Sequence, residues 1–305
     1  MPDLDVLVAG ELNPDLILSD AALEPRFGQQ EILVDSAALT IGASSAIFAC
    51  GAARLGLHVA FAGLCGADLF GRFMLESLQE RGVDVTHVVI DPRLRTGVSV
   101  ILSRDADRSI LTYPGCMTAL HAEQVTEDVL LQARHLHVSS YFLQTALRPG
   151  LPALFRRARS LGLTTSLDTN WDPAEAWLGV LDLLPDCNVF LPNAAEARAI
   201  SGQADAAQAA LDLGVRAGVV AVKLGAEGAL GAQGGQLARV ASLPVRVVDS
   251  VGAGDSFDAG FICGYLKGWD LERCLRLAAV CGALSTQAVG GTDAQPTLEE
   301  ALRLV

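Results

Sequence analysis

Lysine is almost absent from this chain of 305 residues: Lys223 and Lys267 are the only lysines, and the other basic residues are arginines. Neither lysine lies in a Gly-x-x-x-x-Gly-Lys-[Ser/Thr] loop, which excludes the common P-loop mode of nucleotide binding. The formal net charge of −13 argues against binding to nucleic acids, because such binding depends on basic patches. The same charge is compatible with binding one nucleotide, since local dipoles and a metal ion can dominate at such a site.

Long hydrophobic runs and paired cysteines are also missing. No apolar run reaches the length of a membrane span, and the acidic start Met1–Asp5 is unlike a signal peptide, so we expect a soluble cytoplasmic protein with no membrane partner. The seven cysteines contain no Cys-x-x-Cys pair, which fits reduced thiols in an apolar core better than disulfides or zinc. His135 and His137 share one face of a predicted strand, and without a carboxylate or cysteine at ligand spacing they favour a structural role.

What the chain has instead is a regular alternation of strand-like and helix-like segments, with hydrophobic residues making up 51% of the total. This alternation predicts an α/β fold with a mainly parallel central sheet and helices on both faces. Helices are expected at residues 44–55, 69–81 and 271–288, and strands at residues 5–10, 58–62, 136–139, 164–168, 189–191 and 219–224.

Two regions break the alternation. Residues 21–39 and 95–113 contain strand-like pieces with no helix between them, and the second includes a charged turn at Arg104–Arg108 that we expect to be exposed. These pieces predict a small β lid that projects from the main sheet. No linker or repeat divides the chain, so we predict a single domain over residues 1–305 with lid segments at approximately 12–41 and 93–116.

The stretch Asp249–Asp255 carries the clearest chemistry. Valines at residues 245–248 predict a strand before it, and apolar residues at helical spacing predict a helix after it. Glycines let a backbone approach an anion closely, and the N–H groups of a helix start attract negative charge. Asp255 at the helix entrance would then be a general base beside an anion hole, a pairing that suits phosphoryl transfer to an alcohol. One alternative is a simple glycine turn with an aspartate N-cap. Another is a dinucleotide-binding turn, which lacks its third glycine because Phe257 stands there.

Several motifs, in order along the chain, resemble those of the ribokinase-like (pfkB) family of carbohydrate kinases. The resemblance covers essentially the whole chain, and six motifs in register make it specific. They are Gly10-Glu11-Leu12-Asn13-Pro14-Asp15, Gly42-Ala43-Ser44-Ser45-Ala46, Gly63 to Gly71, Asn193-Ala194-Ala195-Glu196, Lys223 to Gly228, and Asp249 to Gly260.

The resemblance implies a ribokinase-like fold and ATP-dependent phosphorylation of a small sugar. Asp255 would accept the proton of the attacking hydroxyl while the amides of Gly252, Ala253 and Gly254 hold the developing charge. The sugar would be bound by Asn13, Asp15, Gly42, Ala43, Ser44 and Asp255. A homodimer formed through the lid is a further expectation.

The resemblance also implies the nucleotide side of the site. The expected ATP-binding residues are Asn193, Lys223, Gly225, Gly228, Gly252 and Gly254. Asn193 and Glu196 would act on Mg²⁺, through water because Mg²⁺ keeps several of its waters. An ordinary polar pair at a helix start is the alternative interpretation of these two residues. The carbonyls of Asp249 and Val251 resemble part of a monovalent-cation site, for which K⁺ is the expected ion.

Departures from the family pattern concern the acceptor. Ribokinases carry a lysine and an asparagine where this chain has Ala43-Ser44-Ser45-Ala46-Ile47, which argues against ribose. Ketodeoxygluconate kinases use arginines to clamp a carboxylate, and the matching places here, Thr112–Gly115 and Asp168–Pro173, contain none. We therefore expect a neutral sugar. The alternatives are a nucleoside kinase or ketodeoxygluconate kinase of the same family, a non-catalytic nucleotide-binding regulator, and a dehydrogenase.

Overall fold

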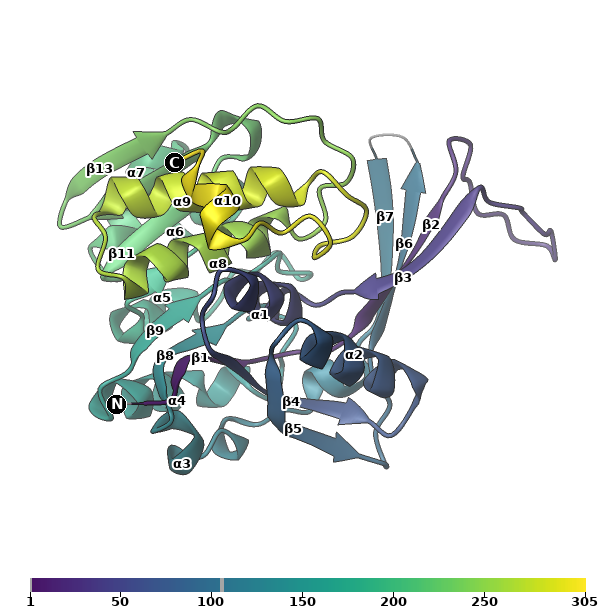
Figure 1. The fold of residues 1–305 in the computed structure, drawn as a ribbon, viewed down its shortest axis with the longest axis horizontal. Helices are drawn as coiled ribbons and strands as arrows, with labels where there is room; N and C mark the ends of the chain where they lie inside the picture. Colours follow the sequence, from purple (N-terminus) through teal and green to yellow (C-terminus); the bar gives the residue numbers. More distant parts are fainter. Residues whose placement is uncertain (1, 105–106) are drawn as a thin grey trace.

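The computed structural model describes residues 2–104 and 107–305 and contains two β-sheets (Figure 1). Over the described residues the larger sheet has nine strands in the order β13-β12-β11-β10-β9-β8-β1-β4-β5, and only the pairs β11–β12 and β12–β13 are antiparallel. Its strands are β1 (Leu4–Ala9), β4 (Val59–Gly66), β5 (Asp84–Asp91), β8 (Ala133–Val138), β9 (Thr164–Leu167), β10 (Val189–Phe190), β11 (Val219–Lys223), β12 (Ala229–Gln233) and β13 (Gln236–Val240). The predicted mainly parallel α/β fold is confirmed.

Both faces of the large sheet are buried, as the alternating side chains of β1 show. Leu7 and Ala9 belong to one apolar cluster, whereas Val6 and Val8 belong to the cluster on the opposite face. The covering helices are α1 (Ser44–Arg54), α2 (Leu69–Glu80), α3 (Glu127–Leu130), α4 (Leu151–Ser160), α5 (Val180–Leu183), α6 (Ala194–Ser201), α7 (Ala206–Gly214), α8 (Ala253–Leu266), α9 (Leu271–Ser285) and α10 (Leu298–Leu302). Within the described ranges, none of the helices combines the length and apolar character that crossing a bilayer requires.

The smaller sheet has four strands in the order β3-β2-β6-β7, and it projects from the body of the molecule in Figure 1. Its strands are β2 (Pro14–Ser19), β3 (Ser36–Ile41), β6 (Val98–Arg104) and β7 (Asp107–Tyr113). The predicted small β lid is therefore present, although residues 21–35 contain no strand. Part of the charged turn expected at Arg104–Arg108, residues 105 and 106, lies outside the described residues.

Two predicted elements differ clearly from the structure, and the others shift at their ends, as in β4, which extends to Gly66 instead of ending at residue 62. Residues 245–248 form no strand: Pro244 precedes them, Val247 and Val248 are exposed, and the Val248 amide donates to the carbonyl of Thr286. Their β-branched side chains fit a strand, but no strand among the described residues pairs with them. The helix expected to reach residue 288 ends at Ser285, where the Thr286 hydroxyl donates back to the carbonyl of Ala283.

Candidate active site

The start of α8 is shaped by two glycines with different requirements. Gly252 precedes the helix with a φ of 71°, and a Cβ there would lie 2.6 Å from the Cα of Gly291. Both its conformation and its surroundings therefore demand glycine. At Gly254 a Cβ would come no closer than 3.6 Å to a protein atom, the Lys223 side chain. Packing does not require glycine at this second position, which leaves room for the close approach of a ligand.

Asp255 is the third residue of α8 and is buried. Burial raises its pKa to about 7, and the neighbouring Asp168 carboxylate acts in the same direction. Lys223 and a hydrogen bond from Ser44 oppose this rise. A carboxylate whose pKa lies near neutral pH suits general-base catalysis, because it is substantially deprotonated yet still basic enough to accept a proton.

Asp255 borders a cavity of about 560 Å³ that extends beneath the lid. The cavity brings together most of the residues predicted to bind the sugar, which are Asn13, Asp15, Ala43 and Ser44. Gly42 is also close, because a Cβ there would lie only 2.1 Å from Oδ1 of Asp15. Residues from the lid, from α1 and from α8 thus converge on one acceptor-sized space.

The lid side of this cavity is polar, and one of its buried polar atoms lacks a hydrogen-bond partner among the described residues. Asn13 Nδ2 donates to Ser99 Oγ at 3.4 Å, while the buried Oδ1 of Asn13 has no hydrogen-bond donor among the described residues. Burial raises the pKa of Asp15 to about 7, although a hydrogen bond from Ser99 and the charge of Arg108 act against the rise. Buried polar atoms are normally hydrogen-bonded, so the Asn13 oxygen fits a hydroxyl of a bound ligand.

Arg108 differs from the sequence expectation. It is exposed, as predicted for the lid turn, but its side chain borders the cavity, and Nη1 donates to Ser250 Oγ at 3.4 Å. Ser250 belongs to the loop that leads into α8. The pairing of β6 with β7 sets Arg108 opposite Ser103, and the local sequence did not indicate that its side chain borders the cavity.

A second cavity, of about 440 Å³, lies on the other side of the α8 start and has largely apolar walls. Its lining includes Gly225 and Gly228 as well as Phe257, and a Cβ on Gly228 would lie 2.1 Å from the carbonyl oxygen of Val240. The two cavities share Lys223, Gly225, Ser250 and Gly254. The predicted anion hole therefore stands where a nucleotide in one cavity and an acceptor in the other would meet.

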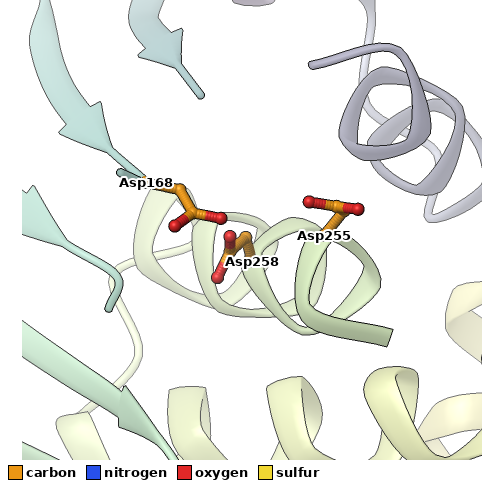
Figure 2. A group of neighbouring side chains, drawn as sticks. All are labelled: Asp168, Asp255 and Asp258. Carbon is orange, nitrogen blue, oxygen red and sulfur yellow. The ribbon is translucent and has the colours of Figure 1, made fainter. Parts of the chain in front are cut away.

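Three carboxylates gather beside this junction, on Asp168, Asp255 and Asp258 (Figure 2). Lys223 Nζ lies 3.1 Å from Oδ2 of Asp168 and 3.0 Å from Oδ2 of Asp258. Burial alone would lower the pKa of Lys223, but these two carboxylates raise it overall, so the ammonium remains charged. Lys223 was predicted to bind the nucleotide; its ammonium is held in internal ion pairs at the border of both cavities, and the nucleotide role stays a prediction.

Comparisons with known proteins identify the family of the chain. A model of the pfkB family of carbohydrate kinases matches residues 3–298. The chain belongs to this family. An uncharacterized sugar kinase of Archaeoglobus fulgidus is 32% identical over 81% of this chain and 98% of its own length. A 2-dehydro-3-deoxygluconokinase of Bacillus subtilis is 31% identical over 85% of this chain and 84% of its own. The protein is thus a sugar kinase, a phosphotransferase that acts on an alcohol group.

A solved structure supports the fold of this pfkB family kinase. A candidate ribokinase II from E. coli, in complex with ATP and Mg²⁺, aligns with a TM-score of 0.86 at 23% identity. The alignment covers 99% of this chain and 98% of that one. At this identity the likeness concerns the fold, and it confirms the ribokinase-like arrangement expected from the motifs.

Asn193 and Glu196 are brought together in the pfkB family kinase as an N-terminal cap of α6. Asn193 Oδ1 accepts from the amide of Glu196 at 3.0 Å, and Glu196 Oε2 accepts from the amide of Asn193 at 2.8 Å. Burial, followed by the charge of Asp168, raises the pKa of Glu196 to about 7, while Lys223 opposes it. The capping alternative therefore describes their local geometry, and both residues also border the acceptor cavity. Their role toward Mg²⁺ stays a prediction.

The loop residues predicted to hold a monovalent cation lie together before α8. Asp249 accepts from the amide of Val251 at 3.0 Å and from the amide of Gly290 at 2.9 Å. The Asp249 side chain therefore fixes the loop. The predicted role of the Asp249 and Val251 carbonyls remains a prediction.

The sequence analysis missed several residues that border the acceptor cavity, most notably Glu11, Ser140 and Asn170. Ser140 and Asn170 have φ values of 53° and 52°, a left-handed backbone that the sequence does not announce. A weak signal existed for Asn170, because it follows β9 at the edge where ligands collect in open α/β sheets. Glu11 lies inside the Gly10–Asp15 motif but was not singled out.

The two histidines of β8 have a structural role. His135 contacts the hydroxyls of Thr164 and Ser166, and His137 contacts those of Ser166 and Ser139, each at 2.7 Å. Every ring nitrogen therefore has a partner in the buried sheet. This agrees with the structural interpretation made from the sequence.

Proposed function

We propose that this kinase transfers the γ-phosphate of ATP to a hydroxyl of a small neutral sugar, with Asp255 as general base. The observation that carries the proposal is the position of Asp255 where two cavities join, at the N-terminus of α8. The amides of Gly252 to Asp255 form the anion hole. Sugar kinase activity follows from the family; the neutral acceptor and the residue roles are the proposal.

The reaction uses these groups in a simple order. Asn13 and Asp15 hold the hydroxyls of the acceptor, and the reacting hydroxyl lies beside the Asp255 carboxylate. As its oxygen bonds to the γ-phosphorus, its proton passes to Asp255 and the bond from phosphorus to the ADP oxygen breaks. The helix-start amides stabilise the charge on the phosphoryl oxygens. Correct positioning of the hydroxyl supplies much of the rate, because an intramolecular-like encounter avoids a large entropic cost.

The residues around Glu196 fit a hydrated Mg²⁺. Glu196 is a buried carboxylate whose pKa is raised, and a nearby cation would relieve the cost of its charge. Asn193 and Glu196 offer the oxygen ligands that Mg²⁺ prefers, and the water-mediated mode leaves their mutual hydrogen bonds intact. When bound, the ion would neutralise phosphate charge next to the anion hole.

The argument for a neutral acceptor rests on two aspartate side chains, Asp15 and Asp172. Asp15 stands in the cavity beneath the lid and would repel an anionic group placed beside it. Asp172 occupies the segment where ketodeoxygluconate kinases carry an arginine. Its carboxylate accepts from the amides of Ala174, Ala176 and Trp177, so it caps a turn and cannot clamp a substrate carboxylate.

Two observations support second candidates. Arg108 borders the cavity, and the Bacillus subtilis relative is named a 2-dehydro-3-deoxygluconokinase, which favours an acidic acceptor as the alternative. Trp171 also borders the cavity with half of its surface exposed, which suits stacking on the base of a nucleoside. A non-catalytic regulator is disfavoured because the glycines and Asp255 are all in place.

The decisive experiment measures ADP release with ATP and Mg²⁺ across a panel of acceptors. Neutral hexoses, pentoses and nucleosides are compared with ketodeoxygluconate and sugar phosphates by their kcat/KM values, with Asp15→Ala as a pocket variant. We expect a neutral acceptor to be preferred, and Asp15→Ala to lower kcat and raise KM for it. An acidic or phosphorylated acceptor that wins by tenfold or more would overturn the neutral-acceptor proposal.

We also propose a monovalent-cation dependence through the loop around Asp249, and a homodimer formed through the lid. The lid exposes the apolar residues Leu39, Leu111 and Tyr113, which suits contact with a second copy. Activity in K⁺ compared with choline tests the first idea, and light scattering after size-exclusion chromatography tests the second. Equal rates, or a monomer at all concentrations, would remove the respective proposal.

A further inference from the structure

Asn170 stands between two buried carboxylates and is linked to both through serine hydroxyls. Its Nδ2 donates to Ser44 Oγ at 2.5 Å and to Ser140 Oγ at 2.8 Å. Ser44 and Asp255 border the same cavity, and the Ser44 side chain acts to lower the pKa of Asp255. On the other side, Ser140 Oγ donates to Glu11 Oε1 at 2.7 Å. One amide group therefore serves the proposed base on one side and Glu11 on the other.

The chemistry of these groups fixes the direction of the hydrogen bonds. An amide NH₂ can only donate, and a serine hydroxyl has a single proton. When Ser44 accepts from Asn170, its proton is left for the Asp255 carboxylate. The same holds for Ser140, whose proton goes to Glu11. Asn170 thus determines that each serine acts as a donor to its carboxylate.

Glu11 anchors the other end of the network to α1, the helix on which Ser44 stands. Glu11 is buried, and it accepts from the amide of Ser45 at 3.2 Å and from Ser45 Oγ at 2.6 Å. The N-cap position of α1 is Ala43, which has no side chain able to cap the helix. Glu11 takes over this capping role, so the first turn of α1 and the Ser44 hydroxyl are held in place.

The backbone around the network is strained at three non-glycine positions. Ala43, Ser140 and Asn170 have φ values of 63°, 53° and 52°, and all three border the acceptor cavity. A left-handed backbone costs free energy in residues with a Cβ, and such strain persists mainly at functional sites, where surrounding contacts enforce it. The network described above supplies these contacts.

We propose that Asn170 is a positioning residue for the transfer reaction: it holds the Ser44 hydroxyl against Asp255, with the Ser140–Glu11 arm as its anchor. The hydrogen bond from Ser44 keeps the Asp255 carboxylate oriented toward the acceptor hydroxyl and stabilises its charged form. This inference rests on the proposed role of Asp255 as general base. It assigns to Asn170 and Glu11 an influence on catalysis without contact to the reacting atoms.

The test is a double-mutant cycle with two readouts. Ser44→Ala removes the donor to Asp255, and Asn170→Gly removes the amide while leaving a residue that suits the φ of 52°. The first readout is the pKa of Asp255 in the protein without ligands, measured by ¹³C NMR with carboxyl-labelled aspartate and assigned by the signal lost in Asp255→Asn. The second is the pH profile of kcat with whichever of D-fructose, D-ribose and adenosine is turned over fastest.

Ser44→Ala should raise the pKa of Asp255 by roughly one unit, because it removes one hydrogen bond to a charged group. Asn170→Gly should raise the pKa in the same direction by less. In the double variant the pKa should equal that of Ser44→Ala, since Asn170 acts through Ser44. The acid limb of the kcat profile should move with these pKa values.

Glu175→Gly is the matched control, because Glu175 is exposed and has a φ of 51° away from the network. It should leave the pKa of Asp255 and the pH profile unchanged. The inference is overturned if Asn170→Gly leaves the Asp255 pKa unchanged, or if its effect is as large in the Ser44→Ala background as in the wild type. Full activity of Asp255→Asn would instead overturn the proposed function, whatever the cycle shows.

Discussion

At the scale of single residues, the site depends on charges that burial makes costly. Asp15, Glu196 and Asp255 all have pKa values raised to about 7, and in each case burial is the largest cause. Only one of them stands at the start of α8, where amides can hold a phosphoryl group. The chemistry of Asp255 therefore differs from that of the other two through its position.

Asp255→Asn should keep the fold and ATP binding while lowering kcat by about 10²- to 10⁴-fold, the usual contribution of a general base. In the wild type, kcat should fall as the pH falls through about 7, because protonation removes the base. Steady-state kinetics and calorimetric titration with ATP check both statements. Retention of a third of the wild-type rate would contradict the assignment.

Lys223→Met should be strongly destabilising. It leaves the buried Asp168 carboxylate without its ammonium partner, and breaking a buried ion pair in this way costs about 3–5 kcal/mol. Asp258→Asn is the comparison: burial raises the pKa of Asp258 well above its ordinary value, so a neutral amide replaces an acid that favours its neutral form. Urea unfolding should show the larger loss for Lys223→Met; equal losses would contradict this account.

At the scale of elements, the start of α8 borders two cavities, and each cavity is lined by a different set of segments. The first glycine is required by the fold, whereas the second leaves open space next to Lys223. The two glycines of one motif therefore serve different purposes. The first shapes the backbone of the turn, and the second keeps the proposed anion hole accessible.

Gly252→Ala should lower the free energy of unfolding by at least about 1–2 kcal/mol, because alanine disfavours its left-handed backbone and the new Cβ meets Gly291. Gly254→Ala should keep the stability but raise the KM for ATP, since its methyl group occupies the space for the phosphates. Thermal melts and ATP titrations of the two variants separate these effects. A Gly254→Ala protein with wild-type KM would remove the ligand argument for this glycine.

At the scale of the whole molecule, the large sheet includes polar side chains that are buried in the apolar interior. His135 and His137 are fully buried, and burial lowers the pKa of His135 to about 3 and that of His137 well below its ordinary value. In the unfolded chain both rings would take up protons near pH 6.5. The folded protein excludes those protons, so the histidines link its stability to pH.

The stability contributed by these histidines is fully present above pH 6.5 and is lost as the pH falls toward the folded pKa values. Lowering the pH from 7.5 to 5.5 should reduce the free energy of unfolding by about 1 kcal/mol for each buried histidine. A His135→Asn/His137→Asn variant should show a smaller loss than the wild type over this range, measured by urea unfolding at both pH values. The carboxylates whose pKa values are raised affect stability in the opposite direction in both proteins, so their contribution cancels in the comparison. An equal loss in the two proteins would contradict the linkage.

The sequence by itself determined the features that are local or carried by motif order. Alternating segments predicted the α/β sheet, and the glycines before Asp255 predicted the helix start and its aspartate. Breaks in the alternation predicted the lid. These features depend on short stretches of sequence, in which side-chain periodicity and glycine conformation decide the secondary structure.

Only the tertiary structure decided the partners of these residues. The contact between Asn170 and Ser44 joins residues 126 positions apart, and the ion pair of Lys223 with Asp168 spans 55 positions. The left-handed backbone of Asn170, the turn of Arg108 toward the cavity and the loss of a strand near Val247 all depend on neighbours contributed by distant segments. These contacts form because the order of the strands in the sheet, together with the lid, brings the ends of distant strands close to one another. The local preference of each segment for helix or strand does not encode which segments become neighbours.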